Sequence, residues 1–195
     1  QKQGEKVKVT CTKSNEGFAT AGGVQYVACA GNFKDAGLEY TGALKVLQMI
    51  FSYEYLWIQI RVKGGAYGCM CSFSDQGDSM FVTYRDPNLS ESYKVYDEAA
   101  DYVADFDADD RDMNKYIIGT IGSMDMPMEA VDMGARSFHA YFLGKTEADL
   151  QKVRDQVLSC TQEDIRALAP IVKAVVEAGN RCCIGNEEKI DQNKD

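Results

Sequence analysis

The stretch Arg61-Val62-Lys63-Gly64-Gly65-Ala66-Tyr67-Gly68 joins the end of a long apolar helix to the start of a strand. The paired glycines predict where the helix ends, because glycine adopts backbone conformations that other residues avoid. We therefore expect Arg61 on the last helical turn and Tyr67 among the first strand residues, so that both can face one cleft. A guanidinium and a phenol placed there could donate hydrogen bonds to a carbonyl oxygen, as acyl-transfer chemistry requires. On spacing alone, the better explanation is an arginine that caps the helix C-terminus and a tyrosine in the core.

The helix before this stretch is predicted to run from Thr41, which can cap its first turn, to about Val62. Its polar residues recur at helical spacing and form one narrow stripe, which comprises Lys45, Gln48, Ser52 and Gln59. The rest of its surface is apolar, so most of the helix should be buried. We expect it to pack on a sheet, with roughly 1.5–3 kcal/mol from each large side chain. The side chains expected at this contact are Leu44, Leu47, Phe51 and Trp57.

Four segments of the chain have β character, namely Val24–Phe33, Ala66–Phe73, Met80–Arg85 and Arg181–Ile184. The first of them carries apolar residues at both odd and even positions, which predicts a strand covered on both faces. The second and third should form a hairpin around residues 74–78, where turn-forming residues gather. All four strands are expected in one sheet.

Between the third and fourth strands the chain is predicted to be helical. The first helical segment should begin at Ser90, and another should begin near Arg111. A further helix is expected to pass through Phe138 and Phe142 and to end at Gly144.

Two capping boxes follow, with aspartate in the place of the usual glutamate. They are Thr146-x-x-Asp149 and Thr161-x-x-Asp164, and each predicts the start of a helix. Pro170 should kink the second of these helices, because proline lacks the N–H that the helix needs.

This order of elements predicts an α+β fold, a mixed sheet with helices packed on one face. Residues 1–20 are expected to form a polar N-terminal segment, either a strand or a linker, and residues 21–195 the domain itself. A chain of 195 residues can bury roughly 70% of the surface that it exposes when unfolded. The N-terminus lacks both an initiating Met and the apolar core of a signal peptide, and we expect the chain to be a piece of a longer protein.

The charge balance argues against partners that are themselves anionic. The chain has 21 basic and 30 acidic residues, a net charge of −9, and no basic stripe compensates locally. We therefore expect no nucleic-acid partner. We expect no membrane partner either, because no apolar run reaches the ~18 residues that span a bilayer. A positively charged substrate would suit this surface, although solubility explains the charge equally well.

The seven cysteines form neither a Cys-x-x-Cys pair nor a zinc-knuckle spacing. Buried free thiols in a reducing compartment explain them best. The expected location is therefore soluble and intracellular, in the cytoplasm or in a mitochondrial or other organellar matrix, and not secreted.

Metal and cofactor sites are not expected in this chain. His139 is the single histidine, so an inverted zinc motif, His-x-x-Glu-His, cannot be completed. The acidic run from Asp105 to Asp112 lacks the glycine and glutamate of a calcium loop, and it is better explained as a helix cap. Gly64 and Gly65 close a helix, whereas phosphate-binding glycines open one.

Several rare strings recur in one order along the chain, from about Asn15 to Lys189. They are Tyr40–Leu44, Tyr55–Trp57, Arg61–Gly68, Tyr84–Leu89, Lys115–Ile121 and Cys183–Glu187. In these strings the chain resembles the last domain of presequence-protease-type inverted zincins, which belong to the pitrilysin and insulysin superfamily.

The resemblance implies the C-terminal, non-zinc-binding domain of a zinc metalloendopeptidase that degrades short unfolded peptides. It implies that zinc is bound by N-terminal domains of the same polypeptide, absent from this chain, and that the domains close around a chamber. The family's arginine and tyrosine, which reach the substrate carbonyl and its oxyanion, match Arg61 and Tyr67. The alternative from another class is a non-catalytic scaffold or assembly module of the same fold.

Overall fold

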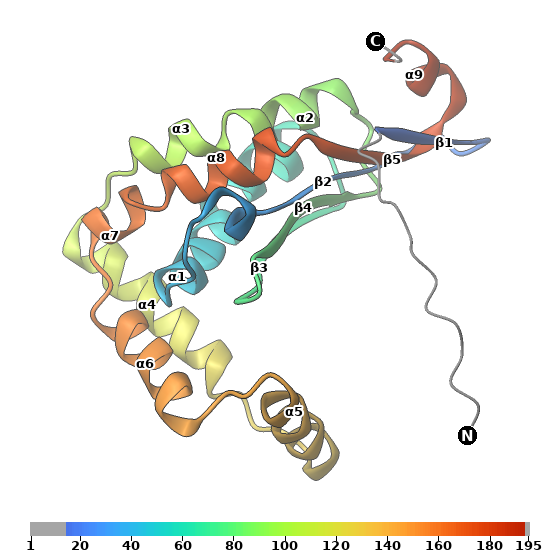
Figure 1. Cartoon of the computed structure of the whole chain (residues 1–195). Coiled ribbons are helices and arrows are strands. Elements are labelled where there is room, and N and C mark those ends of the chain that lie inside the picture. Colours follow the sequence, from blue (N-terminus) through green and yellow to red (C-terminus); the bar gives the residue numbers. More distant parts are fainter. Residues whose placement is uncertain (1–14, 194–195) are drawn as a thin grey trace, which may run out of the picture.

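The computed structural model describes residues 15–193, and the sheet at its centre has the strand order β1-β5-β2-β4-β3 (Figure 1). β1 and β5 pair in parallel and the other neighbours are antiparallel, so the sheet is mixed. The strands are β1 (Glu16–Thr20), β2 (Tyr26–Asn32), β3 (Gly68–Phe73), β4 (Asp78–Tyr84) and β5 (Asn180–Asn186). The four expected strands share this sheet, and the α+β fold class is confirmed.

β1 lies within the segment that was expected to be a polar strand or linker, and it pairs with β5 from Glu16 to Thr20. Residues 1–14 of that segment lie outside the described residues. The division of the chain at residue 20 stays a prediction.

The sheet is covered on one face only. Figure 1 shows α1, α2, α3 and α8 on the same side of it, and no described helix lies on the other side. Along β2, Val27 and Cys29 are fully buried, whereas Tyr26 and Ala30 are exposed. The prediction that this strand is covered on both faces is therefore wrong. Its apolar residues alternate between a packed face and an open face.

The long helix begins as α1 (Ala43–Ile50) and continues as two π-helical segments, η2 (Phe51–Tyr55) and η3 (Trp57–Lys63). The Thr41 hydroxyl accepts a bond of 3.4 Å from the Ala43 amide at its start. The π-helical winding begins at Phe51. In its first turn the Ser52 hydroxyl donates to the Gln48 carbonyl at 2.7 Å, so this carbonyl has a donor besides the backbone ladder.

Burial along this run agrees with the sequence prediction only in its first half. Leu44, Leu47 and Phe51 are fully buried, but Trp57 is 41% exposed, so its predicted place in the core is wrong. In the π-helical part Leu56 and Ile60 occupy the core side. Trp57 is thereby left on the outer surface of the run.

Three further helices complete the packed face, namely α2 (Ser90–Asp97), α3 (Ala99–Ala104) and α8 (Ala169–Glu177). Tyr96 of α2 is buried, and its hydroxyl donates to the Val27 carbonyl of β2 at 3.1 Å. α8 lies directly on β2, where a Cβ added to Gly31 would be 2.5 Å from the Val175 carbonyl oxygen. A side chain of any size at position 31 would therefore displace α8.

The remaining helices lie beyond the sheet or at its ends. They are η1 (Phe33–Ala36), α4 (Asp110–Met124), α5 (Ala130–Phe142), α6 (Glu147–Leu158), α7 (Gln162–Arg166) and α9 (Glu187–Asp191). Both predicted capping boxes are present at the starts of α6 and α7. The prediction that Pro170 kinks a helix is wrong. This residue lies in the first turn of the separate helix α8, where its missing N–H has no intrahelical partner to lose.

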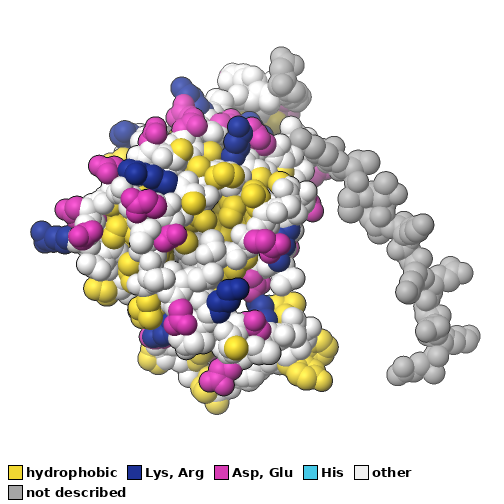
Figure 2. All heavy atoms as spheres, turned by 60° about the vertical axis from the view of Figure 1, so that its left-hand side comes forward, with side chains coloured by type: hydrophobic (Ala, Val, Ile, Leu, Met, Phe, Trp, Pro, Cys, Tyr) yellow, Lys and Arg dark blue, Asp and Glu magenta, His cyan; other side chains and the backbone are white. Residues whose placement is uncertain are grey.

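α5 stands apart from the core. It ends before Gly144, which has a left-handed φ of 65°, and none of its residues is buried. Figure 2 shows apolar side chains gathered at the lower end of the molecule, where Figure 1 places α5. Among the described residues, no helix has the length and apolar character to cross a bilayer.

The described thiols are largely inside the fold. Cys29, Cys71, Cys160 and Cys183 are buried, and each described cysteine is free. Burial raises the pKa of Cys160 to about 12 and that of the half-buried Cys69 to about 11. These thiols remain protonated at neutral pH, so they are weak nucleophiles.

The contact between α8 and β2 gives a prediction on stability. Gly31→Ala should lower the free energy of unfolding by about 1–3 kcal/mol, because its methyl group has no room against Val175 and Ala178. Gly122→Ala, in α4 with open space around it, should instead raise stability by up to about 1 kcal/mol. Denaturant unfolding of both variants measures the difference. If Gly31→Ala is as stable as the unmodified chain, the close seating of α8 on β2 is contradicted.

Candidate functional site

The glycine pair closes the helical run and aims the chain into β3. The Gly64 amide donates to the Gln59 carbonyl at 3.0 Å, and the Ala66 amide reaches the Ile60 carbonyl at 3.1 Å. Gly65 then turns the chain with a left-handed φ of 80°, which a residue with a side chain adopts only under strain. Tyr67 follows directly before β3, at the edge of the sheet.

Arg61 holds this turn from the last part of η3. Its Nη1 donates to the carbonyl oxygens of Ala66, at 3.0 Å, and Tyr67, at 2.6 Å. The guanidinium also lies over two rings, 4.9 Å from the centre of Trp57 and 5.5 Å from that of Tyr67. Arg61 therefore binds backbone carbonyls, as the simpler explanation predicted. These carbonyls belong to the loop after the helix and not to its last turn. The Nε and Nη2 of Arg61 have no hydrogen-bond partner within residues 15–193.

Tyr67 is not a core residue, contrary to the simpler explanation of the sequence. Its side chain is 66% exposed, and its hydroxyl has no bonded partner in the described part of the chain. The ring packs edge-on against Tyr84, with 5.9 Å between centres. The structure thus brings Arg61 and Tyr67 together at the sheet edge, with donors of both residues not used by the fold.

Apolar side chains continue from Tyr67 across the open face of the sheet. Tyr84 meets Tyr26 at 5.5 Å between ring centres, Tyr26 lies opposite Ile184, and Ile184 lies opposite Phe18. We call this set the open-face row: Phe18, Ile184, Tyr26, Tyr84 and Tyr67. Each member is between 39% and 66% exposed. The row was not predicted from the sequence, although the alternation of apolar residues along the strands was a signal for it.

Buried polar groups beneath the row hold the neighbouring loops in place. The Asp86 carboxylate accepts from the Asn88 amide at 2.9 Å and from the Ser92 hydroxyl at 2.7 Å. The Asn88 side chain in turn donates to the Gly64 carbonyl at 2.6 Å. The glycine turn is therefore fixed by the loop after β4 as well as by Arg61.

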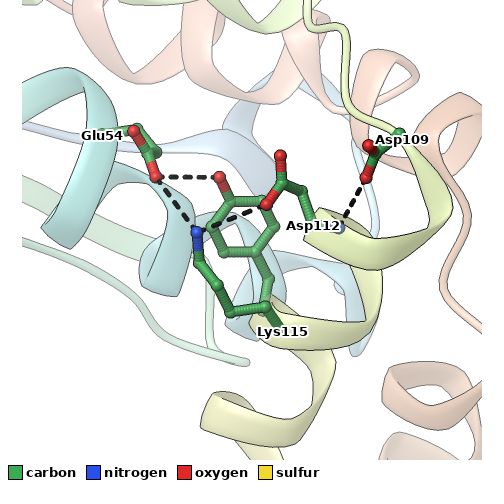
Figure 3. A network of polar contacts seen from close by, with 5 residues as sticks. Glu54, Asp109, Asp112 and Lys115 are labelled. Atoms are coloured by element: carbon green, nitrogen blue, oxygen red, sulfur yellow. Dashed lines mark hydrogen bonds and ion pairs between the residues drawn. The ribbon is translucent and has the colours of Figure 1, made fainter.

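A second polar network joins α4 to η2, and Figure 3 shows its members. Glu54 accepts from the Tyr116 hydroxyl at 2.9 Å and lies 3.8 Å from the Lys115 ammonium. Lys115 also pairs with Asp112, whose amide is capped by Asp109 at 2.9 Å. Burial, together with the bond to Glu54, raises the pKa of Tyr116.

This network is structural. Each charge in it faces an opposite charge or a donor, and the acidic residues at the start of α4 form the helix cap that the sequence predicted. It leaves no group poised to bind a ligand.

The residues that the structure describes do not fit a zinc ion. Within residues 15–193 no three His, Cys, Asp or Glu side chains converge on a point where a metal could be held. His139 lies on α5 among aromatic residues, as expected, and its side chain is exposed.

The family model of the PreP C-terminal domain matches residues 15–186. Protein HypA of Clostridium perfringens is 44% identical over 183 residues, which are 94% of this chain and 19% of that protein. Presequence protease 1, chloroplastic/mitochondrial, of Arabidopsis thaliana is 34% identical over 178 residues, which are 91% of this chain and 16% of that protein. The chain thus spans less than a fifth of the length of these relatives.

Solved structures show the same fold. A peptidase M16 inactive domain from Pseudomonas fluorescens matches with a TM-score of 0.64 at 15% identity, over 93% of this chain and 46% of that one. A zinc protease described as putative, from Bordetella pertussis, matches with a TM-score of 0.61 at 15% identity, over 83% of this chain and 92% of that one.

The bonds of Arg61 predict a measurable role in stability. Arg61→Met keeps most of the aliphatic part of the side chain but removes the two hydrogen bonds that Nη1 donates to the Ala66 and Tyr67 carbonyls. This change should lower the free energy of unfolding by about 1 kcal/mol. Arg111→Met is the matched control, because Arg111 is exposed and makes no described bond, and should change stability by less than about 0.5 kcal/mol. Thermal or denaturant unfolding distinguishes the two. Equal effects would show that the bonds to the loop contribute nothing.

Proposed function

Because the chain belongs to the PreP C-terminal domain family, we propose that it is the C-terminal, non-zinc-binding domain of a zinc metalloendopeptidase. In this proposal the parent protein degrades short unfolded peptides, and this domain forms part of a closed chamber. The presequence protease of Arabidopsis thaliana, of which the chain matches a segment, supports the reaction class.

The observation that carries the proposal is the arrangement of Arg61 and Tyr67. The Nε and Nη2 groups of Arg61 and the hydroxyl of Tyr67 have no hydrogen-bond partner within residues 15–193, and the two side chains are in contact. We assign these groups to the carbonyl of the peptide bond under attack, where they would stabilise the oxyanion as it forms.

The fixed position of Arg61 suits that role. Its Nη1 is bound to two loop carbonyls, and its central carbon lies over the rings of Trp57 and Tyr67, so the guanidinium has little freedom left to lose. Donors that are already oriented need no rearrangement as negative charge develops on the substrate, and this makes their stabilisation larger.

The open-face row supports a peptide as the ligand. Exposed aromatic and aliphatic side chains on a sheet contact apolar residues of many kinds, because such contacts follow area and not a particular pattern of hydrogen bonds. Unfolded peptides expose these residues, whereas folded proteins bury them.

Zinc chemistry belongs, in this proposal, to another domain of the parent protein. A bound zinc ion there would activate the attacking water, and the partners of this chain are the N-terminal domains that carry it. The free thiols are compatible with a reducing location, cytoplasm or organellar matrix, and the Arabidopsis relative is named chloroplastic/mitochondrial.

The chain by itself should not cleave peptides. It lacks the ligands that hold a catalytic zinc, so incubation with an unstructured peptide and excess zinc should release no fragments above background. Mass spectrometry of the peptide measures this directly. Cleavage that a chelator abolishes would contradict the assignment of zinc to another domain.

The role of Tyr67 can be separated from folding in the full-length parent enzyme. Tyr67→Phe keeps the ring against Tyr84 and removes only a hydroxyl that has no partner among the described residues, so stability should not change. If that hydroxyl is an oxyanion donor, kcat should fall by about 10²–10³. Tyr53→Phe is the matched control, since Tyr53 is equally exposed but lies on η2, away from Arg61 and Tyr67, and should leave kcat unchanged.

The same measurement tests the alternative of a scaffold module. The Tyr67→Phe and Arg61→Lys variants of the parent enzyme are measured separately. If both cleave peptides at the unmodified rate, neither side chain acts on the carbonyl. Lysine keeps the charge of Arg61 but loses its planar fork of donors.

A further inference from the structure

A cleft of about 570 Å³ lies at the other end of the long helix, between α1, the end of α4, α5 and the turn of the β3–β4 hairpin. It is separate from Arg61 and Tyr67, neither of which lines it. Its size is within the range of cavities that hold small ligands or short peptide segments.

Positive charge dominates this cleft in a chain whose net charge is −9. The charged residues that line it are Lys45, Arg136, Lys145 and Asp75, three cations against one carboxylate. Lys145 is paired with Asp75. The cations of Lys45 and Arg136 thus remain without a carboxylate partner within residues 15–193.

The excess of positive charge affects Lys45 most. Its ammonium makes no described hydrogen bond or ion pair, although the residue is half-buried. Burial lowers the pKa of Lys45, Asp75 acts against that effect, and the nearby charges of Arg136 and Lys145 add to it. A buried cation among like charges gains most when an anion binds beside it.

The rest of the lining is apolar and adaptable. Four methionines contribute to it, Met49 from α1 and Met124, Met126 and Met128 from the end of α4 and the loop after it. Unbranched thioether side chains repack around ligands of different shape, and such surfaces bind varied apolar groups. The Arg136 Nη1 lies 3.9 Å from the Met128 sulfur, so cationic and apolar walls are contiguous.

We propose that this cleft, which we call the Lys45 cleft, binds a peptide carboxylate that lies next to an apolar side chain. Lys45 and Arg136 would hold the carboxylate, and the methionines would contact the adjoining side chain. The choice of a peptide as the ligand rests on the proposed function. The charge complementarity and the apolar wall are properties of the cleft itself.

The test is direct binding to the 195-residue chain, with no cleavage involved. A fluorescein-labelled peptide that ends in two apolar residues and a free carboxylate should bind about tenfold more tightly than its C-terminal amide, by fluorescence anisotropy. A third peptide, an amide with one internal glutamate beside an apolar residue, identifies the source of the carboxylate. Binding like the free acid shows that a side chain suffices, and binding like the amide shows that the C-terminus is required.

Variants assign the binding to the cleft. Lys45→Met and Arg136→Gln should each weaken binding of the free acid by about tenfold and leave the amide unaffected. Lys173→Met, which removes an equal charge from the solvent-exposed side of α8, should leave binding of the free acid within about twofold. Arg136 is on the exposed helix α5, so its variant remains informative if Lys45→Met fails to fold.

Two results would overturn the proposal. One is equal binding of acid and amide, and the other is an equal loss with Lys173→Met and with the cleft variants. Neither result would bear on Arg61 and Tyr67, which are tested by turnover and lie outside the cleft.

Discussion

The buried pair of Gln25 and Asp86 holds together the parts of the structure on which the candidate site depends. Their backbones exchange two hydrogen bonds, of 2.7 and 2.8 Å, and both residues are fully buried. The Gln25 side chain also donates to the Asp86 carbonyl and accepts from the Asn186 amide at the end of β5. Through the Asp86 carboxylate the same pair holds the start of α2, and through Asn88 it reaches the glycine turn. A polar group buried at this depth is costly unless each of its bonds is made, so these bonds favour the observed arrangement of the loops.

A sheet packed on one face explains both what the sequence predicted and what it could not. The strands, the hairpin, the capping boxes and the glycine stop depend on neighbours close in sequence, and each was found where the local chemistry placed it. The open side of β2 could not be predicted, because Tyr26 and Val27 are equally apolar and only the position of distant helices decides which is covered. Trp57 was misplaced for a related reason. The change to π-helical winding alters which residues face the core, and no residue pattern announced it.

The candidate site was predictable in position but not in its bonding. The spacing of Arg61 and Tyr67 around two glycines placed both at the junction of helix and strand. In the folded turn, one nitrogen of Arg61 donates to loop carbonyls and its other donors do not. The sequence could not predict this division. The structural and functional explanations of Arg61 are therefore compatible, since the bonds that hold the loop also fix the direction of the remaining donors. Tyr67 is different, because its side chain is exposed and its hydroxyl has no partner in the described part of the chain.

β3 connects the two candidate sites, the donors of Arg61 and Tyr67 and the cations of the Lys45 cleft. Tyr67 precedes this strand, and the hairpin turn that follows it carries Asp75 at the wall of the Lys45 cleft. β3 is also the edge of the described sheet, so one side of its backbone is not paired with another strand. At about 3.3 Å per residue, the path from Tyr67 to Phe73, the last residue of β3, is roughly 20 Å long. An extended peptide that reached from the donors of Arg61 and Tyr67 to the cations of the cleft would therefore need at least about six residues. The distance between the two sites, set by the length of one edge strand, is then a physical limit on which peptides can occupy both.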